Sequence, residues 1–287
     1  MKNIINYYYH LYPDKIYQTE KYYYFFIGDS RYTIIKYTEN MEDIKQIYNM
    51  NINMLKNKIY VHPIILNNQN SPITVYKGNG YILLKTIYYK TQKNIESIMK
   101  FSPIIATTKE IEWGKLWARK NDYLEFQVKY LGQDHEIIRN SFNYYIGLGE
   151  NAIELINMLG KSEYPHIYAH KRIKEDIYNP LNIIIDLKTR DPAEYFKEQF
   201  FQKKDIKKEL NYYIRSINNT VDFITFFSRM LYPTYYFDIF EEVITNRKGD
   251  EELVKVIQKK DSYEKLLKEI YQKNKKYMNN IIIEWLE

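Results

Sequence analysis

The chain contains no cysteine, and this absence excludes several kinds of chemistry. Disulfides, thiolate nucleophiles and zinc sites built on cysteine ligands are all ruled out. Of the five histidines, only His166 and His170 lie four residues apart. Pro165 and the apolar residues between the two histidines favour a strand that runs into a loop, so we expect no metal site there.

Glycine and long apolar runs are also scarce. There are 9 glycines in 287 residues, and no apolar run approaches the roughly 20 residues that cross a bilayer. The first residues form no continuous apolar stretch and include no small-residue cleavage site, so we expect no secretory signal and synthesis inside the cell. A chain of this length can bury two modest lobes or one large domain.

The charge balance is mildly basic and carries no nucleic-acid signature. Lysine and arginine number 42 against 36 aspartates and glutamates, a net charge of +6. Most basic residues lie three or four positions from acidic ones, as in segment 203–210, which is typical of solvated helix faces. Nucleic-acid binders usually concentrate basic residues in a stripe beside aromatics. We therefore expect no nucleic-acid partner.

Tyrosine is the residue in clear excess, with 32 copies. Lysine, isoleucine and asparagine are abundant together with it, and this is the composition that an AT-rich genome produces. A second interpretation is that exposed phenols support oxidative cross-linking in an assembled layer. The composition favours the first interpretation and leaves the second open.

The first third of the chain is typical of a β-rich lobe. Residues 21–37 form two β-prone runs around Gly28-Asp29-Ser30, which is a hairpin signal. The segment 41–58 has the apolar spacing of a helix. Three short β-prone runs follow, at 59–66, 72–76 and 81–87.

From about residue 91 the pattern turns helical. Helices are predicted at 94–99, 109–130, 150–159, 193–201, 207–230, 236–244, 250–258 and 261–273, with a β-like interruption at 164–187. A small β-rich N-lobe (1–90) before a larger, mainly helical C-lobe (91–287) predicts an α+β fold of two lobes. This is the arrangement of the protein-kinase-like and aminoglycoside-phosphotransferase-like folds.

Phosphoryl transfer needs residues that position phosphate, bind metal and orient the attacking hydroxyl. Lys36 ends the second β-prone run, where a kinase keeps the lysine that touches the nucleotide phosphates, and Glu42 or Asp43 could pair with it. The spacing equally fits an exposed lysine at a strand end. Gly28 is the only glycine of the first hairpin, and Asp29 beside it would repel phosphate, so the glycine-rich phosphate loop is missing.

The catalytic loop of small-molecule kinases reads His-Gly-Asp, four residues and Asn, followed by a strand and a magnesium-binding Asp. Residues 168–188 are the corresponding segment. His170 keeps the first position, Arg172 replaces the aspartate, and Ile177 stands at the asparagine position. Because arginine stays charged, it cannot accept a proton near neutral pH. We therefore expect His170 and Arg172 to be vestigial and no residue to be catalytic.

Asp186, at the end of the isoleucine-rich strand, is the one candidate metal ligand. A single carboxylate with cationic neighbours holds Mg²⁺ poorly, so we expect no metal and no other cofactor. Asp176 or Glu175 could replace the lost aspartate only through an unusual loop. Lys36 is left as the residual candidate for contact with a nucleotide.

Three stretches of the sequence carry a family resemblance. They are residues 141–156, residues 186–200, and a C-terminal series at 228–243, 261–271 and 284–286. Together they resemble the YutH-type endospore coat-associated proteins, relatives of the CotS spore coat family. Matches to the family pattern in the second stretch are Asp186, Arg190, Asp191, Ala193 and Glu194; departures in the first two are Asn143, Gly149, residues 187–189 and Pro192.

The resemblance implies a kinase-like fold, synthesis in the mother-cell cytoplasm and a place in the spore coat. The matching residues themselves fit structural roles. We expect Asp191 to cap a helix that begins at Pro192, with Glu194 completing a capping box. We expect Gly147 and Gly149 in a tight loop before the helix at 150–159. Core or lobe-interface aromatics, rather than a ligand cage, are expected at Tyr144, Tyr145 and Trp117.

The sequence therefore predicts a pseudokinase: a non-catalytic, kinase-fold component of the endospore coat that acts through contacts with other coat proteins. The alternative is an active or nucleotide-binding small-molecule phosphotransferase that uses Lys36 and Asp186. A third hypothesis, a basic nucleic-acid-binding module, is the least favoured. No membrane span is expected, and the sequence does not determine the oligomeric state.

Overall fold

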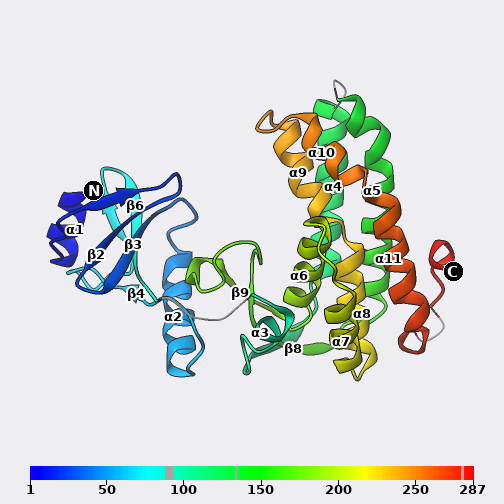
Figure 1. Cartoon of the computed structure of the whole chain (residues 1–287), viewed down its shortest axis with the longest axis horizontal. Coiled ribbons are helices and arrows are strands. Elements are labelled where there is room, and N and C mark those ends of the chain that lie inside the picture. Colours follow the sequence, from blue (N-terminus) through cyan, green and yellow to red (C-terminus); the bar gives the residue numbers. More distant parts are fainter. Residues whose placement is uncertain (88–92, 133–134, 279–280) are drawn as a thin grey trace. The chain divides into compact units, whose positions relative to one another are not determined.

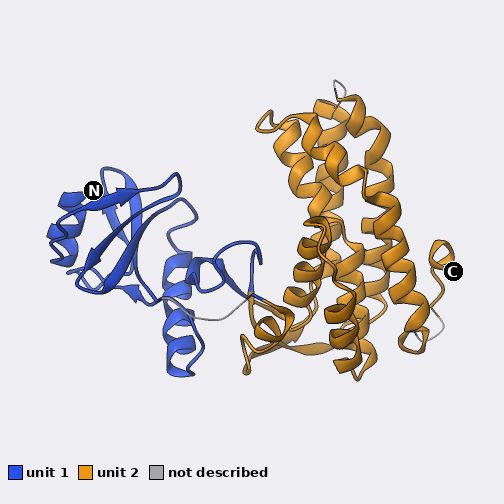
Figure 2. Ribbon diagram, viewed as in Figure 1, with its two compact units in different colours: residues 1–93, 170–184 blue, residues 94–169, 185–287 orange. Residues whose placement is uncertain are grey.

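The computed structural model describes the chain except for residues 88–92, 133–134 and 279–280. It consists of two compact units, which Figure 2 distinguishes by colour. The first contains residues 1–93 and 170–184, and the second contains residues 94–169 and 185–287. The lobes expected from the sequence divided the chain once, at residue 90. In the structure the segment 170–184, which carries the catalytic-loop positions, belongs to the first unit.

The first unit is built on an antiparallel sheet (Figure 1). Its strands are β1 (Ile16–Gln18), β2 (Tyr22–Ile27), β3 (Ser30–Tyr37), β4 (Ile64–Ile65), β5 (Thr74–Tyr76) and β6 (Asn79–Thr86). They lie in the order β1-β2-β3-β6-β4, with β5 paired to β6. The predicted hairpin is confirmed: Gly28, at φ 53°, and Asp29 turn the chain between the paired residues Ile27 and Ser30.

A short N-terminal helix covers one face of this sheet. In α1 (Lys2–Tyr9), Ile4 and Ile5 are buried against Phe25, Ile34 and Leu83 of the strands. The sequence does not predict this helix, because three consecutive tyrosines favour a strand and no side chain caps its start. The helix depends on burial of its isoleucines rather than on local propensity.

The opposite face of the sheet packs against α2 (Asp43–Lys56), which confirms the helix predicted at 41–58. Ile44 and Ile47 of α2 lie in one cluster with Ile82 and Leu84 of β6. Period-two alternation sends neighbouring residues of each strand to different faces. Strand side chains that pack against α1 therefore share one face of the sheet, and those that pack against α2 share the other.

The second unit is mainly helical, with a sheet in the order β7-β8-β9. Its strands are β7 (Ile105–Glu110), β8 (Glu163–His170) and β9 (Ile183–Leu187). The last residue of β8 and the first two of β9 belong to segment 170–184, which is assigned to the first unit. Its helices are α3 (Ile95–Met99), α4 (Trp113–Leu131), α5 (Glu136–Asn157), α6 (Arg190–Phe201), α7 (Lys207–Ser216), α8 (Thr220–Leu231), α9 (Thr234–Ile244), α10 (Asp250–Ile257) and α11 (Lys260–Lys273). Among the described residues, no helix is both long and apolar enough to span a bilayer.

Several predicted boundaries in this unit are wrong. Residues 109–110 belong to β7, and the helix begins only at Trp113. The helix predicted at 207–230 is two helices, because the Asn219 side chain accepts a hydrogen bond from the Asp222 N–H (2.8 Å) and starts α8 anew. Helix α6 begins at Arg190 with Thr189 at its N-cap position, so Asp191 is not the cap and Pro192 lies inside the first turn. A first-turn proline costs little because its missing N–H would have no partner within the helix.

The loop predicted at Gly147 and Gly149 is also wrong, because α5 runs through both positions. A Cβ at Gly149 would lie 2.9 Å from Nδ2 of Asn121, a buried residue of α4, whereas a Cβ at Gly147 would meet nothing within 4 Å. Gly149 is therefore a packing requirement between two helices, not a turn.

Aromatic stacking fills much of the helical core. Tyr145 stacks on Tyr236 with ring centroids 3.7 Å apart, and Trp117 stacks on Tyr232 at 4.4 Å. All four are buried, and Tyr144 is half-buried. The interpretation of Tyr145 and Trp117 as core aromatics is confirmed.

We expect Gly149→Ala to destabilise the protein by about 1–3 kcal/mol, because the new methyl group displaces Asn121 from its hydrogen bonds. Gly147→Ala is the matched control in the same helix and should be neutral or stabilising by up to about 1 kcal/mol. Urea-induced unfolding measures both. Equal effects of the two substitutions would contradict the packing role of Gly149.

Candidate active-site region

Segment 170–184, which contains the catalytic-loop positions, is held in a fixed conformation by hydrogen bonds between its own residues. The Asn182 side chain accepts from the Arg172 N–H (3.0 Å) and donates to the carbonyl oxygens of Arg172 (2.9 Å) and Asp176 (3.2 Å). His170 is buried, and its Nε2 donates to the carbonyl oxygen of Ile177 at 2.9 Å. The backbone that would present a catalytic base is thus folded around Asn182, a role that no sequence pattern predicts.

This loop is attached to the β-rich first unit. The backbone N–H of His62 donates to the carbonyl oxygen of Tyr178 (2.8 Å). Leu181 packs against the hydrophobic cluster that contains Ile44 of α2. Asn51 of α2, fully buried, donates to the carbonyl oxygen of His62 (2.9 Å). The loop and the sheet therefore form one packed body.

A histidine–aspartate pair joins the loop to the sheet. His62 Nδ1 accepts a hydrogen bond from the Ile87 N–H (3.2 Å), which leaves the proton of the neutral ring on Nε2. Nε2 then donates to Asp176 Oδ2 at 3.0 Å, and the other oxygen of Asp176 accepts the Tyr178 N–H. Partial burial opposes ionisation of Asp176, but the hydrogen bonds from the His62 ring and from the Tyr178 N–H hold its pKa below the usual value.

Asp176 also lines a pocket of about 300 Å³ in the first unit. The pocket is bounded by Tyr22, Arg31, Thr33, Ile35, His62, Leu84, Thr86, Ile87, Asp176, Tyr178 and Asn179. The guanidinium of Arg31 lies 4.3 Å from the ring centroid of Tyr24, as in a cation–π contact. Glu175, the other carboxylate considered from the sequence, is exposed and does not line this pocket.

Lys36 does not lie on the pocket side of the sheet. Arg31, Thr33 and Ile35 line the pocket, so Lys36, one residue further along β3, points to the opposite face. Its cross-strand partner Tyr81 packs against the α1 cluster. Lys36 is exposed, and among the described residues no ion pair joins it to Glu42 or Asp43.

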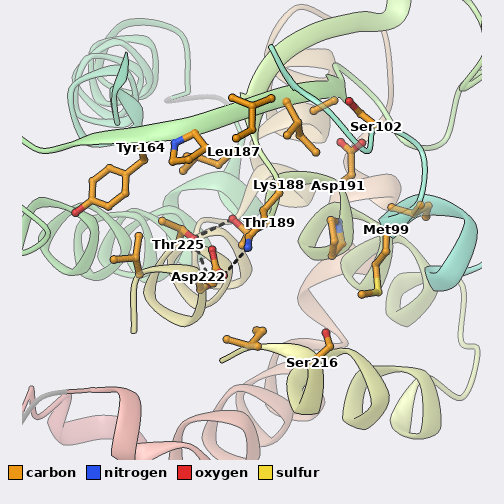
Figure 3. A pocket seen from close by; sticks show the side chains of 18 of the residues that line it. Met99, Ser102, Tyr164, Leu187, Lys188, Thr189, Asp191, Ser216, Asp222 and Thr225 are labelled. Atoms are coloured by element: carbon orange, nitrogen blue, oxygen red, sulfur yellow. Dashed lines mark hydrogen bonds and ion pairs between the residues drawn. The ribbon is translucent and has the colours of Figure 1, made fainter. Parts of the chain in front are cut away.

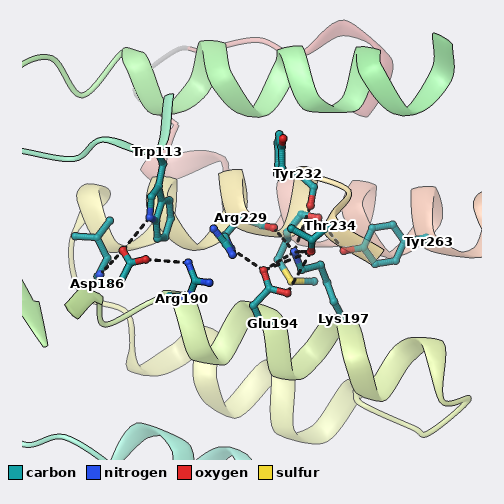
Figure 4. Close-up of polar contacts among 11 residues, drawn as sticks. Trp113, Asp186, Arg190, Glu194, Lys197, Arg229, Tyr232, Thr234 and Tyr263 are labelled. Carbon is teal, nitrogen blue, oxygen red and sulfur yellow. Dashed lines mark hydrogen bonds and ion pairs between the residues drawn. The ribbon is translucent and has the colours of Figure 1, made fainter. Parts of the chain in front are cut away.

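Asp186 lies in the second unit, where protein donors occupy its carboxylate (Figure 4). Oδ1 accepts the Trp113 indole N–H (2.8 Å) and the Leu187 N–H (2.8 Å), and Oδ2 pairs with Arg190 Nη1 at 2.8 Å. Protein donors therefore use three of the about four acceptor sites of this carboxylate. Within the described ranges, no group of three or more His, Asp and Glu side chains is placed to hold a metal ion.

Next to Asp186, the helical core contains a buried cluster of charges (Figure 4). Glu194 Oε1 accepts from Arg229 Nε (2.6 Å) and from Lys197 Nζ (2.9 Å). Lys197, 2% exposed, also donates to the carbonyl oxygens of Arg229 and Tyr232 and to Thr234 Oγ1. The guanidinium of Arg229 lies over the Trp113 ring at 5.1 Å.

These contacts set the ionisation of the cluster. Burial would raise the pKa of Glu194, but the cations of Lys197, Arg229 and Arg190 hold it well below its usual range. Burial lowers the pKa of Lys197 to about 8 despite the attraction of Glu194. Glu194 was predicted to complete a capping box, and that assignment is wrong. Arg190 and Glu194, four residues apart, lie on one face of α6, and this spacing was the signal for the cluster.

Comparisons with known proteins agree on family and fold. A sequence profile described as "Spore coat putative kinase YutH" matches residues 2–281. Endospore coat-associated protein YutH of Bacillus subtilis is 27% identical over 154 residues, and the match covers 45% of this chain and 45% of that protein, less than half of each.

Two solved structures are similar over most of the chain. An aminoglycoside phosphotransferase from Alicyclobacillus acidocaldarius has a TM-score of 0.62 at 10% identity and covers 91% of this chain and 92% of its own. Spectinomycin phosphotransferase, solved with ADP and spectinomycin, has a TM-score of 0.56 at 12% identity, with 90% and 92% covered. These likenesses confirm the predicted kinase-like, aminoglycoside-phosphotransferase-like fold.

We expect Glu194→Gln to lower the free energy of unfolding by about 3–5 kcal/mol, because it leaves Arg229 and Lys197 buried without a counter-charge. The control is Glu96→Gln, which removes an exposed partner of Lys100 at 2.6 Å and should change stability little. Chemical denaturation followed by circular dichroism compares them. Similar losses for both variants would contradict a structural dependence on the buried cluster.

Proposed function

The chain belongs to the YutH family of spore coat kinase-like proteins, and we propose that it is a non-catalytic, pseudokinase component of the endospore coat. In this proposal it acts through contacts with other coat proteins and transfers no phosphoryl group. The fold is that of a phosphotransferase, but the chemistry depends on the residues of the site and not on the fold.

The state of Asp186 is the observation that carries the proposal. Phosphoryl transfer requires a carboxylate at this position that is free to bind Mg²⁺. Here both oxygens accept hydrogen bonds from the protein, and one of them forms a buried ion pair with Arg190. Breaking that pair would leave an uncompensated buried charge, which costs several kcal/mol. Metal binding would therefore compete with the stability of the fold.

Two further features support the loss of catalysis. Arg172 stands where a base is needed, and the hydrogen bonds of Asn182 hold its backbone. Lys36 points away from the pocket that Asp176 lines, so phosphates in that pocket would lie across the sheet from it. The second candidate function, nucleotide binding or transfer with Lys36 and Asp186, is favoured only by the presence of that pocket.

We expect isothermal titration calorimetry with ATP and Mg²⁺ to show no metal-dependent binding at millimolar nucleotide, because Asp186 is already paired. A coupled assay should likewise show no phosphoryl transfer. Asp186→Asn, which keeps an acceptor for the Trp113 indole, is the comparison variant. Mg²⁺-dependent binding by the wild type that disappears in Asp186→Asn would sink the pseudokinase proposal and establish the second candidate.

Placement in the coat rests on the family, and it is tested separately. We expect a tagged copy of the chain, expressed in its spore-forming host, to co-purify with the coat fraction of mature spores. Lys36→Ala and Arg172→Ala change exposed side chains of the vestigial site and should leave this incorporation unchanged. Recovery only from the cytoplasm or the spore core would contradict a coat function, and loss of incorporation in both variants would contradict a non-catalytic one.

A further inference from the structure

A large cavity lies entirely within the second unit, separate from every residue considered above as catalytic or nucleotide-binding. Its volume is about 640 Å³, within the range of cavities that hold small molecules. Figure 3 shows it between β8 on one side and the helices α3, α7 and α8. These walls are marked by Tyr164 of β8, Met99 of α3, Ser216 of α7 and Thr225 of α8.

The walls are mainly apolar, and the apolar character continues to the rim. Isoleucine, leucine, methionine, proline, valine, alanine and tyrosine make up most of the lining. Ile105 is 62% exposed and Met99 is 36% exposed at the same cavity. A ligand that covers exposed apolar side chains at the rim of an apolar cavity removes their surface from water, which favours binding.

The charges of the lining residues are already matched. Lys188 is the only cation among the lining residues, and its Nζ pairs with Asp222 Oδ2 at 2.7 Å. Asp191, 5% exposed, lies in the first turn of α6, where the helix dipole favours a negative charge. An anion would meet two carboxylates and no spare cation, whereas a cation would find Asp222 already paired and Asp191 almost fully buried.

Two hydroxyl groups of the lining form hydrogen bonds within the protein. Thr189 Oγ1 donates to Thr225 Oγ1 (3.0 Å), and Thr225 Oγ1 donates to the carbonyl oxygen of Asp222 (3.2 Å). Because the chain of donors ends on a carbonyl, both hydroxyl protons are used. Thr189 is 1% exposed and Thr225 is 2% exposed, so this pair offers a ligand no unmatched donor.

The wall that carries Thr189 is held in place from behind. Residues 187–189 lie between Asp186 and Arg190, which pair with each other in the buried charge cluster. A short segment clamped at both ends loses little conformational entropy on binding, so the cavity is pre-formed.

We propose that this cavity binds a small, uncharged, mainly apolar molecule. The proposal is independent of the proposed coat function, because no lining residue belongs to the vestigial kinase site.

The test uses three probes with one ring system and different charges: 2-naphthalenemethanol, 2-naphthylmethylamine as its cation, and 2-naphthoate. Ligand-observed NMR with the full chain measures their affinities at neutral pH. We expect saturable binding of the alcohol, with the carboxylate and the ammonium each at least 10-fold weaker. No saturable binding of the alcohol, or equal or tighter binding of either ion, would overturn the proposal.

Two variants fill the cavity from opposite walls. Ser216→Trp on α7 and Met99→Trp on α3 each place an indole in it, and each should weaken the alcohol at least 10-fold. Tyr212→Trp is the matched control, an exposed position on α7 that does not line the cavity, and it should bind as the wild type does. Circular dichroism confirms folding, and if one filled variant does not fold, the other decides. Unchanged affinity in a folded, filled variant would also overturn the proposal.

Discussion

The helical unit is organised around the carboxylate of Glu194, which pairs with two buried cations. Arg229 comes from α8 and Lys197 from α6 itself, and Lys197 continues to backbone oxygens at the end of α8 and to Thr234 at the start of α9. Three helices therefore meet at one anion. Its ionisation is secured by those cations, and in turn they tolerate burial only because it is charged.

The buried charge cluster extends to Asp186, which stands at the position where a kinase has its metal-binding aspartate. Arg190 lies one turn before Glu194 on α6, and its guanidinium pairs with Asp186 at the end of β9. A kinase leaves this aspartate open to Mg²⁺, whereas here it ties a strand to the helix that follows. The carboxylate that binds metal in a kinase is thus used to hold together the core of this protein, and the face of that segment away from Asp186 borders an apolar cavity.

Local patterns predicted much of the fold. Hydrophobic periodicity and turn chemistry predicted the hairpin in 21–37, its turn at Gly28 and the helix α2. The structure confirms all three. The errors arose where packing overrides local preference. Glycine usually indicates a loop, but Gly149 lies within a helix because the Asn121 side chain of the neighbouring helix packs against it. Helix α1 forms from a tyrosine-rich segment because Ile4 and Ile5 are buried.

For the candidate site, the sequence by itself determined which chemical groups stand at each position. Position 172 holds an arginine, which stays charged near neutral pH, and the first hairpin contains a single glycine, whatever the fold. Only the tertiary structure decided the partners. Trp113 lies 73 positions before Asp186, and His62 lies 114 positions before Asp176, so no local pattern could show either contact. The face on which Lys36 lies was decided in the same way, because a one-residue change of register moves a side chain across the sheet, and register follows from packing between distant segments.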